Sequence, residues 1–137
     1  MGKKRIVLDT NIIISAFGWD GKPREIFRKI LNKEFDLIIS KKQLEEIYKV
    51  LEYPKFKFTD SQKSRFINIL VKISIIVNTY NKLDIIKDDP YDNNILESAA
   101  KNNVDYLISG DKDLLRLKNI NYIRILTANE FLELIKK

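Results

Sequence analysis

The 137-residue sequence contains no Cys and no His. Without Cys, the chain has no disulfides, no thiolate nucleophiles and none of the usual zinc sites. Without His, a Ser-His-Asp triad, imidazole acid–base chemistry and His-ligated metals are also excluded. If the protein is an enzyme, its chemistry must therefore depend on carboxylates and on hard cations that bind oxygen ligands.

Glycine and proline are scarce, with four and three residues, and we find no linker, repeat or low-complexity segment. No apolar run approaches the roughly 20 residues that span a bilayer. A signal peptide is not expected, because Asp9 interrupts the apolar run that begins after Arg5. We therefore expect one domain over residues 1–137, in a cytoplasmic protein without a membrane segment.

Short apolar runs alternate with segments of helical periodicity. The runs predict strands at residues 5–8, 35–39, 75–77, 106–108 and 123–126. Helical spacing of apolar residues predicts helices around residues 26–31, 44–51 and 66–73, another from Pro90, and a last one in TANEFLELIKK. This alternation indicates a three-layer α/β/α domain around a mainly parallel sheet of about five strands. Continuous apolar runs are typical of strands buried on both faces.

Acidic side chains follow the ends of the predicted strands. In strand order they are Asp9, then Glu45 and Glu46, then Asp88, Asp89 and Asp92, then Asp111 and Asp113. The carboxyl ends of parallel strands share one edge of the sheet, where open α/β sheets bind ligands. Acids that are distant in the sequence should therefore meet in one cleft.

Each acid also has a structural explanation, since Asp is a favoured helix N-cap and acids in a first turn offset the helix dipole. Asp89 before Pro90 fits an N-cap, and Asp111 could cap the helix that follows it. As a set, however, the acids repel one another, by on the order of 4 kcal/mol for a pair about 4 Å apart. A divalent cation removes this repulsion, and ligands that are all oxygen select Mg²⁺ or Mn²⁺. Such sites are typical of phosphoryl-transfer enzymes.

Four segments that carry these acids resemble, in order and spacing, the motifs of PIN-domain proteins. They are VLDTNIIISAF, LIISKKQLEEIYKVL, DDPYDNNILESAA and YLISGDKDLL. The resemblance is greatest to the branch described as toxins of toxin–antitoxin pairs, and it extends to the closing ILTANEFLELI. It implies a Rossmann-like α/β/α fold and a metal-dependent ribonuclease.

The resemblance also implies roles for individual residues. Carried over one by one, the catalytic and metal-binding acids are Asp9, Glu46, Asp92 and Asp111. Asp113 matches a further metal-site acid, Thr10 and Asn11 complete the turn after the first acid, and Ser109 matches a small hydroxyl residue before the last motif's Gly-Asp.

Neighbouring acids remain alternatives at two of these positions. The helical wheel does not decide between Glu45 and Glu46, and the motif spacing selects Glu46. Asp88 and Asp89 are alternatives to Asp92, and we interpret them as loop and cap.

The expected reaction is hydrolysis of single-stranded RNA with Mg²⁺ or Mn²⁺ as cofactor. The formal net charge of +6 agrees with a polyanionic partner, although genome bias can produce a Lys-rich composition as well. Residues 53–58 alternate aromatic residues with Lys, an arrangement that can bind phosphates while the rings stack on bases. The alternative, which we slightly favour, is that Phe56 and Phe58 pack under a turn while the lysines are solvated. The candidate RNA contacts are Arg24, Lys55, Lys57 and Lys112.

Other interpretations fit the residues less well. A haloacid-dehalogenase-like phosphatase requires a second Asp where Asn11 stands, and a receiver domain requires two adjacent acids after its first strand. An RNA-processing nuclease, or a non-catalytic RNA- or partner-binding PIN-like module, stays open. The resemblance further implies a homodimer and, for a toxin, an antitoxin partner.

Overall fold

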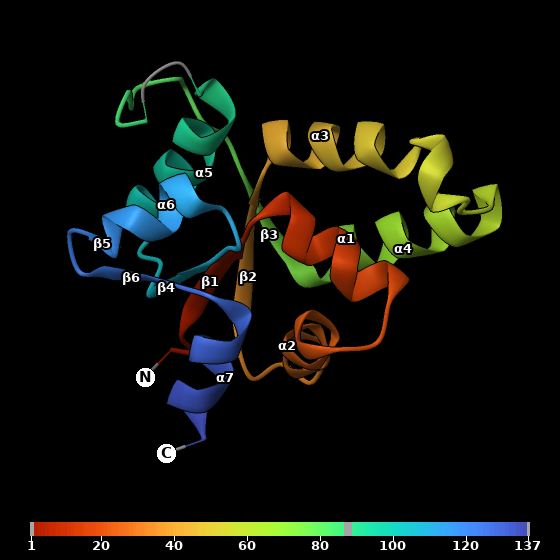
Figure 1. Ribbon diagram of the computed structural model, residues 1–137, viewed down its shortest axis with the longest axis horizontal. Coiled ribbons are helices and arrows are strands. Elements are labelled where there is room, and N and C mark those ends of the chain that lie inside the picture. The colour runs from red at the N-terminus through yellow and green to blue at the C-terminus, as the bar shows by residue number, and fades with distance from the viewer. Residues whose placement is uncertain (1, 87–88, 137) are drawn as a thin grey trace.

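A mixed sheet forms the middle layer of the molecule (Figure 1). The computed structural model describes residues 2–86 and 89–136, and over these residues the strand order is β3-β2-β1-β4-β6-β5. The strands are β1 (Arg5–Leu8), β2 (Asp36–Ser40), β3 (Ser74–Val77), β4 (Tyr106–Ile108), β5 (Asn119–Ile120) and β6 (Ile123–Leu126). Neighbouring described strands are parallel, apart from β5, which runs antiparallel to β6. The predicted fold class is confirmed.

Helices cover both faces of the sheet (Figure 1). They are α1 (Thr10–Gly18), α2 (Lys22–Leu31), α3 (Lys41–Leu51), the short 3₁₀ helix η1 (Pro54–Phe56), α4 (Asp60–Ile73), α5 (Pro90–Ala100), α6 (Lys112–Leu117) and α7 (Ala128–Ile135). The molecule has one hydrophobic core on each face of the sheet. Successive side chains of β1 pack into opposite cores, because side chains alternate between the two faces of a strand. Ile6 and Leu8 pack with α1 to α4 and α7, whereas Val7 packs with α5 and α6. No helix among the described residues combines the length and apolar character needed to cross a membrane.

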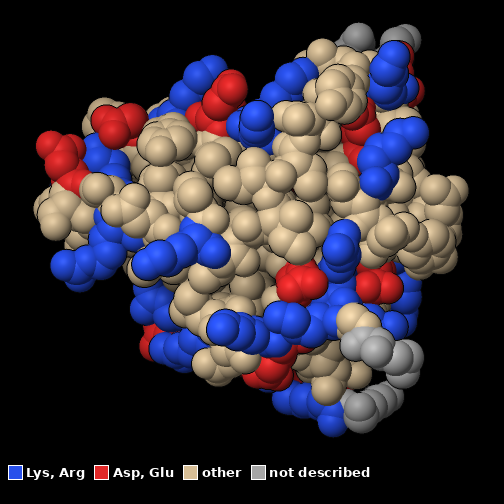
Figure 2. Space-filling model, turned by 180° about the vertical axis from the view of Figure 1, so that it is seen from behind, with Lys and Arg blue, Asp and Glu red and all other residues tan. Residues whose placement is uncertain are grey.

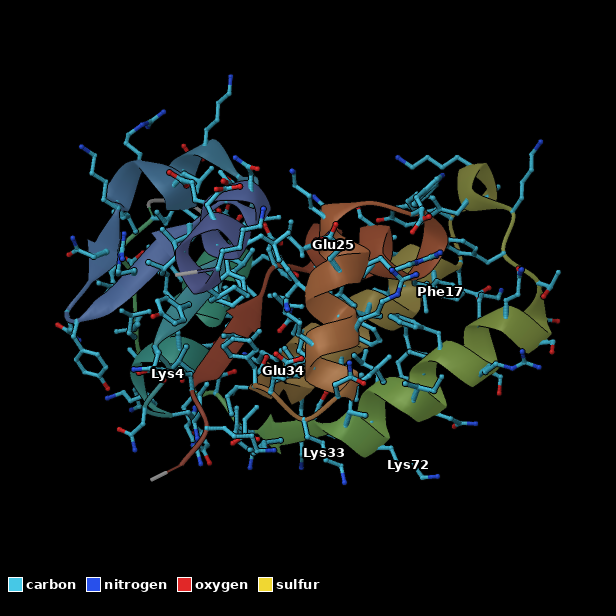
Figure 3. All side chains as sticks on the ribbon, turned by 90° about the horizontal axis from the view of Figure 1, so that it is seen from below. Lys4, Phe17, Glu25, Lys33, Glu34 and Lys72 are labelled. Carbon is cyan, nitrogen blue, oxygen red and sulfur yellow. The ribbon has the colours of Figure 1, made fainter. Side chains whose placement is uncertain are left out.

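The end of α1 is fixed by aromatic packing. Phe17, labelled in Figure 3, stacks on Phe66 of α4 with 4.3 Å between ring centroids and contacts Phe58 at 4.6 Å. Because α1 begins directly after β1, these contacts hold the helix that starts at the candidate site.

Lysines mark the opposite end of the sheet. Lys4, Lys33 and Lys72, labelled in Figure 3, are exposed and lie close before β1, β2 and β3 in the sequence. The amino edge of the sheet therefore carries exposed lysines, together with acids such as Glu34 and Asp36 that pair with Lys29 and Lys3.

The edge strand β3 is less buried than its apolar sequence predicts. Ile75 is 38% exposed and Ile76 is 36% exposed, because β3 pairs with β2 on one side only. The expectation that the strands are buried on both faces is thus wrong for β3. Figure 2, which shows the molecule from behind, has a broad uncharged area in the middle of that face, bordered by Lys and Arg and in places by Asp and Glu.

The short strand β5 was not predicted from the sequence. It contains two residues, too few to give a period-2 signal, and lies between Lys118 and Asn121, which both have positive φ angles (63° and 55°). The antiparallel hairpin it forms with β6 extends the sheet beyond the five predicted strands.

Candidate active site

Asp9 follows β1, the strand from which the sheet is extended in both directions. The chain adds β2 and β3 on one side of β1 and β4 and β6 on the other, so the carboxyl ends of β1 and β4 border a switch point. The Asp9 N–H donates to the Ile108 carbonyl at the end of β4 (2.9 Å), and Ser109 Oγ donates to Asp9 Oδ2 (2.7 Å). Two adjacent strand ends therefore fix both the main chain and the carboxylate of Asp9.

The environment of Asp9 disfavours its charge. The residue is 4% exposed, and burial raises the pKa of the Asp9 carboxyl, with a further increase from the charge of Asp111. Hydrogen bonds from Ser109 and the Asn11 N–H offset part of this rise in the pKa. A buried carboxylate whose donors only partly compensate its desolvation is a candidate ligand for a cation.

Tyr91 joins the first turn of α1 to α5. Its hydroxyl is hydrogen-bonded to Thr10 Oγ1. Burial raises the pKa of Tyr91 well above its ordinary value, and the charges of Asp9, Glu46 and Asp92 raise it further. Acids from three separate parts of the chain therefore act on the Tyr91 hydroxyl. The sequence motifs did not single out Tyr91.

Asp92 is the most unusual acid of the site. It is 2% exposed, and its Oδ2 has no hydrogen-bond partner among the described residues. Burial raises the pKa of Asp92 to about 8, and the charges of Asp111, Asp89 and Asp9 contribute to the rise. Asp89 caps α5 by accepting the Asp92 N–H at Oδ1 (3.0 Å). Asp88, the other alternative, lies outside the described residues.

Asp111 and Asp113 follow β4 and begin α6. The Asp111 N–H donates to Ser109 Oγ (2.9 Å), and the Asp113 N–H donates to Asp111 Oδ1 (2.8 Å). Ser109 therefore bonds both Asp9 and the main chain of Asp111, which keeps the first and last acidic motifs together. Asp113 is exposed, and one of its carboxylate oxygens lies within 4.8 Å of an oxygen of Asp92.

Of the two acids on α3, Glu46 is half-buried and Glu45 is exposed. The charge of Glu46 also acts on Tyr91. This placement favours Glu46 as the second acid, although its role as a metal ligand stays a prediction.

Taken together, the acids fit a hard divalent cation. In the part of the chain that the structure describes, one buried oxygen of Asp92 has no hydrogen-bond partner, and the charges of Asp9 and Asp111 act on this carboxyl. A buried carboxylate among others of like charge is costly unless a cation is bound. All the available ligand atoms are oxygens, which Mg²⁺, Mn²⁺ and Ca²⁺ prefer.

Buried amides and hydroxyls hold the helices that carry the acids, and these residues were missed in the sequence. Gln43 Nε2 donates to the Leu8 carbonyl (2.6 Å), directly before Asp9. Ser40 Oγ caps α3 by accepting the Gln43 N–H (3.0 Å) and donates to Asn94 Oδ1 of α5 (2.8 Å). For Asn94 the available signal was the polar run DNN in the first half of α5.

The loop between β3 and α5 is held by side chains of α5. Asn93 Oδ1 accepts the N–H groups of Ile85 and Ile86, each at 2.8 Å. Glu97 accepts the N–H groups of Tyr80 and Lys82. The chain leading to Asp89 is thereby tied to the same helix that presents Asp92.

Arg24, one of the candidate RNA contacts, has a structural partner. Its guanidinium donates to the carbonyls of Ala16 (Nε, 3.0 Å) and Phe17 (Nη2, 2.7 Å) in the last turn of α1. Two of its donors therefore satisfy helix-end carbonyls. RNA binding by Arg24 stays a prediction.

The 53–58 segment packs as the favoured alternative predicts. Phe56 and Phe58 are half-buried and stack on each other at 5.5 Å and 16°. Lys55 and Lys57 are exposed, and Lys55 Nζ lies 5.2 Å from the centre of the Phe56 ring. Lys112 is exposed beside Asp111. The aromatic rings thus serve packing, and the three lysines remain candidate phosphate contacts.

The fold and its acids define a class of protein, an open α/β sheet with a carboxylate cluster at its switch point. Within this class, the PIN domain family profile matches residues 5–113, and the chain belongs to the PIN domain family. The chain is also similar to an uncharacterized protein of Methanocaldococcus jannaschii, with 29% identity over 148 residues that cover 98% of this chain and 94% of the relative. PIN domains are generally nucleases and typically use divalent metal ions, which agrees with the acidic cluster.

Proposed function

We propose that this protein is an endoribonuclease that hydrolyses single-stranded RNA and depends on Mg²⁺ or Mn²⁺. The observation that carries the proposal is the buried Oδ2 of Asp92, which has no hydrogen-bond partner within residues 2–86 and 89–136. It belongs to a carboxyl that feels the charges of Asp9 and Asp111. A protein gains no stability from such an arrangement. It gains affinity for a cation that can contact a phosphodiester.

In this proposal the residues that hold the cation are Asp9, Glu46, Asp92 and Asp111, with Asp113 as a further acid. When bound, a divalent cation lowers the pKa of an attacking water and neutralises charge that develops on the phosphate. Ser109 orients the Asp9 carboxylate by its 2.7 Å hydrogen bond. Thr10 and Tyr91 fix the distance between α1 and α5, and hence between Asp9 and Asp92.

RNA fits the charge distribution better than a neutral substrate does. The chain has a formal net charge of +6 although its site is acidic, so positive charge must be concentrated elsewhere. Exposed lysines such as Lys55, Lys57 and Lys112 are available for phosphates and would make affinity fall as salt rises. Unpaired bases suit such a site because their faces can stack on side chains.

The resemblance to the toxin branch supports a more specific role. We propose that the protein is the toxin of a toxin–antitoxin pair in the cytoplasm, that it forms a homodimer, and that an antitoxin occludes the acidic cleft. A nuclease of RNA processing would carry the same site. Inhibition by a protein encoded next to it would distinguish the two roles.

The test is cleavage of a mixture of single-stranded RNAs with Mg²⁺, with Mn²⁺ and with EDTA. We expect cleavage with a divalent ion, none with EDTA, and a loss of more than about 100-fold in Asp9→Asn, because removing even outer-shell partners of metal ligands typically costs 10–100-fold. Glu46→Gln should lose activity similarly. The adjacent substitution Glu45→Gln is the matched control and should retain it. Metal-independent cleavage, or an active Asp9→Asn, would overturn the proposal.

A further inference from the structure

Two aromatic side chains are exposed where α1 and α3 end, at the end of these helices that lies away from the sheet (Figure 1). Trp19, directly after α1, is 51% exposed, and Tyr53, two residues after α3, is 47% exposed. Both pack on Phe56 of η1: the Tyr53 ring stacks on it at 6.3 Å and 5°, and the Trp19 ring meets it at 5.8 Å and 65°. Exposed apolar side chains that gather in one patch mark an interaction site, whereas single ones need no explanation. We call Trp19 and Tyr53 the ring pair.

One face of α3 connects the acidic site to the ring pair. Glu46, the α3 acid of the proposed site, and Lys49 are three residues apart, and Tyr53 follows Lys49 by four residues. Side chains at these spacings lie on the same face of a helix. The Tyr53 N–H still donates to the Val50 carbonyl (3.1 Å), so the helical turn continues as far as Tyr53. At about 1.5 Å per residue, this path is about 10 Å long.

The charges around the ring pair favour a polyanion. Each acid that adjoins one of the rings in the sequence has a basic partner: Arg28 Nη2 lies 3.8 Å from Asp20 Oδ1, and Lys63 Nζ lies 2.8 Å from Glu52 Oε1. Three exposed lysines close to the rings in the sequence form no ion pair within residues 2–86 and 89–136, namely Lys49, Lys55 and Lys57. Cations without acidic partners beside exposed rings suit RNA better than an apolar protein surface.

We propose that a single-stranded RNA bound at the acidic site continues along α3 and stacks unpaired bases on Trp19 and Tyr53. Its phosphates contact Lys49, and Lys55 and Lys57 hold the strand beyond the rings. Stacking on aromatic side chains next to a basic groove binds single strands with little dependence on sequence. A duplex has no unpaired base to offer, so this surface selects single strands. The inference rests on the proposed function and adds a binding surface outside the acidic cluster.

The test uses Trp19, the single tryptophan of the sequence, as its own probe. Single-stranded oligo(U) is added to the protein in EDTA at low salt, where metal-dependent cleavage does not occur, and tryptophan fluorescence is recorded. We expect saturable quenching of Trp19, with an affinity that falls as salt rises. A duplex of oligo(A) and oligo(U) at the same concentration should quench it much less, because its bases are paired.

Variants of the ring pair test the stacking directly. We expect the Kd of labelled oligo(U), measured by fluorescence anisotropy, to rise about 5–150-fold in Trp19→Ala and in Tyr53→Ala, the range that corresponds to the loss of one stacked base. Tyr53→Phe keeps the ring and should bind like the wild type. Lys49→Gln should lower the slope of log Kd against log salt by about 0.7. The control is Tyr122→Ala, which removes a tyrosine that is 64% exposed between β5 and β6 and should leave the Kd unchanged.

The outcomes separate this inference from the proposed function. Binding of oligo(U) without quenching of Trp19, and with the same Kd in Trp19→Ala and Tyr53→Ala, would refute the path along α3 and leave the proposed function intact. A wild-type dimer that becomes a monomer in Trp19→Ala, measured by light scattering, would show that the ring pair is a protein interface and overturn the inference. No binding of oligo(U) at low salt would also refute it, and together with the absence of metal-dependent cleavage would overturn both.

Discussion

Two buried acids on the same helix, Asp92 and Glu97, have opposite environments. Each is 2% exposed. Burial raises the pKa of Glu97, but hydrogen bonds from the N–H groups of Tyr80, Lys82 and Leu83 outweigh it, so that the pKa lies below its ordinary value. Burial and neighbouring acids raise the pKa of Asp92 to about 8. Depth alone therefore does not distinguish a structural acid from a candidate metal ligand, whereas the hydrogen-bond partners and neighbouring charges of the two acids differ.

The largest expected effect is that of Asp92→Asn on activity. The change removes a carboxylate of the proposed cation site, so we expect RNA cleavage to fall more than about 100-fold. The amide can donate to the neighbouring acids, and the cost of a charge there disappears, so the melting temperature of the metal-free protein should be equal or higher. Thermal unfolding in EDTA measures this. A melting temperature several degrees lower would mean that Asp92 is structural, like Glu97.

The converse substitution, Glu97→Gln, should affect stability. An amide offers one acceptor oxygen and no charge to the N–H groups of Tyr80 and Lys82. Hydrogen bonds to charged groups contribute about 1.5–3 kcal/mol each, and a buried unsatisfied donor costs about 1–3 kcal/mol. We expect a loss of about 1–3 kcal/mol in the free energy of unfolding, measured in urea, while Mn²⁺ binding of the folded fraction is kept. An unchanged urea midpoint would contradict this assignment.

The smallest expected effect is the pH dependence of that loss. A carboxyl whose pKa is lower in the folded state than its ordinary 4.5 stabilises the fold above about pH 4.5 and ceases to do so as pH falls through its folded-state pKa. The difference in unfolding free energy between wild type and Glu97→Gln should thus be full at pH 7 and shrink below pH 4.5. A difference that is constant from pH 7 to pH 3.5 would attribute the loss to packing.

The sequence predicted those parts of the molecule that depend on local pattern. Asp9 was assigned to the end of a buried strand, because the apolar run stops there, and the structure places it there. The strand at 75–77 was predicted, but its exposure was not. The burial of an edge strand depends on which elements pack against it, and the sequence of the strand does not contain that information. β5 was not predicted, because two residues are too few to show the alternation of a strand.

Roles that depend on distant partners were not predictable. Tyr91 and Glu97 look like ordinary residues of an amphipathic helix, and their partners lie in α1 and in the loop after β3. Asp89 was interpreted as a cap, which is confirmed. Its proximity to Asp113, from another part of the chain, appears only in three dimensions.

The hydrogen bonds between side chains of α5 and the main chain of the preceding loop determine which substitutions the loop can accept. Asn93 and Glu97 bind main-chain N–H groups at positions 80, 82, 85 and 86, which every amino acid except proline supplies. The side chains of the loop can therefore be exchanged, in evolution or by design, while the acids stay in place. The loop borders a cavity of about 510 Å³ next to Asp89, so the lining of this cavity can change while the acids stay in place.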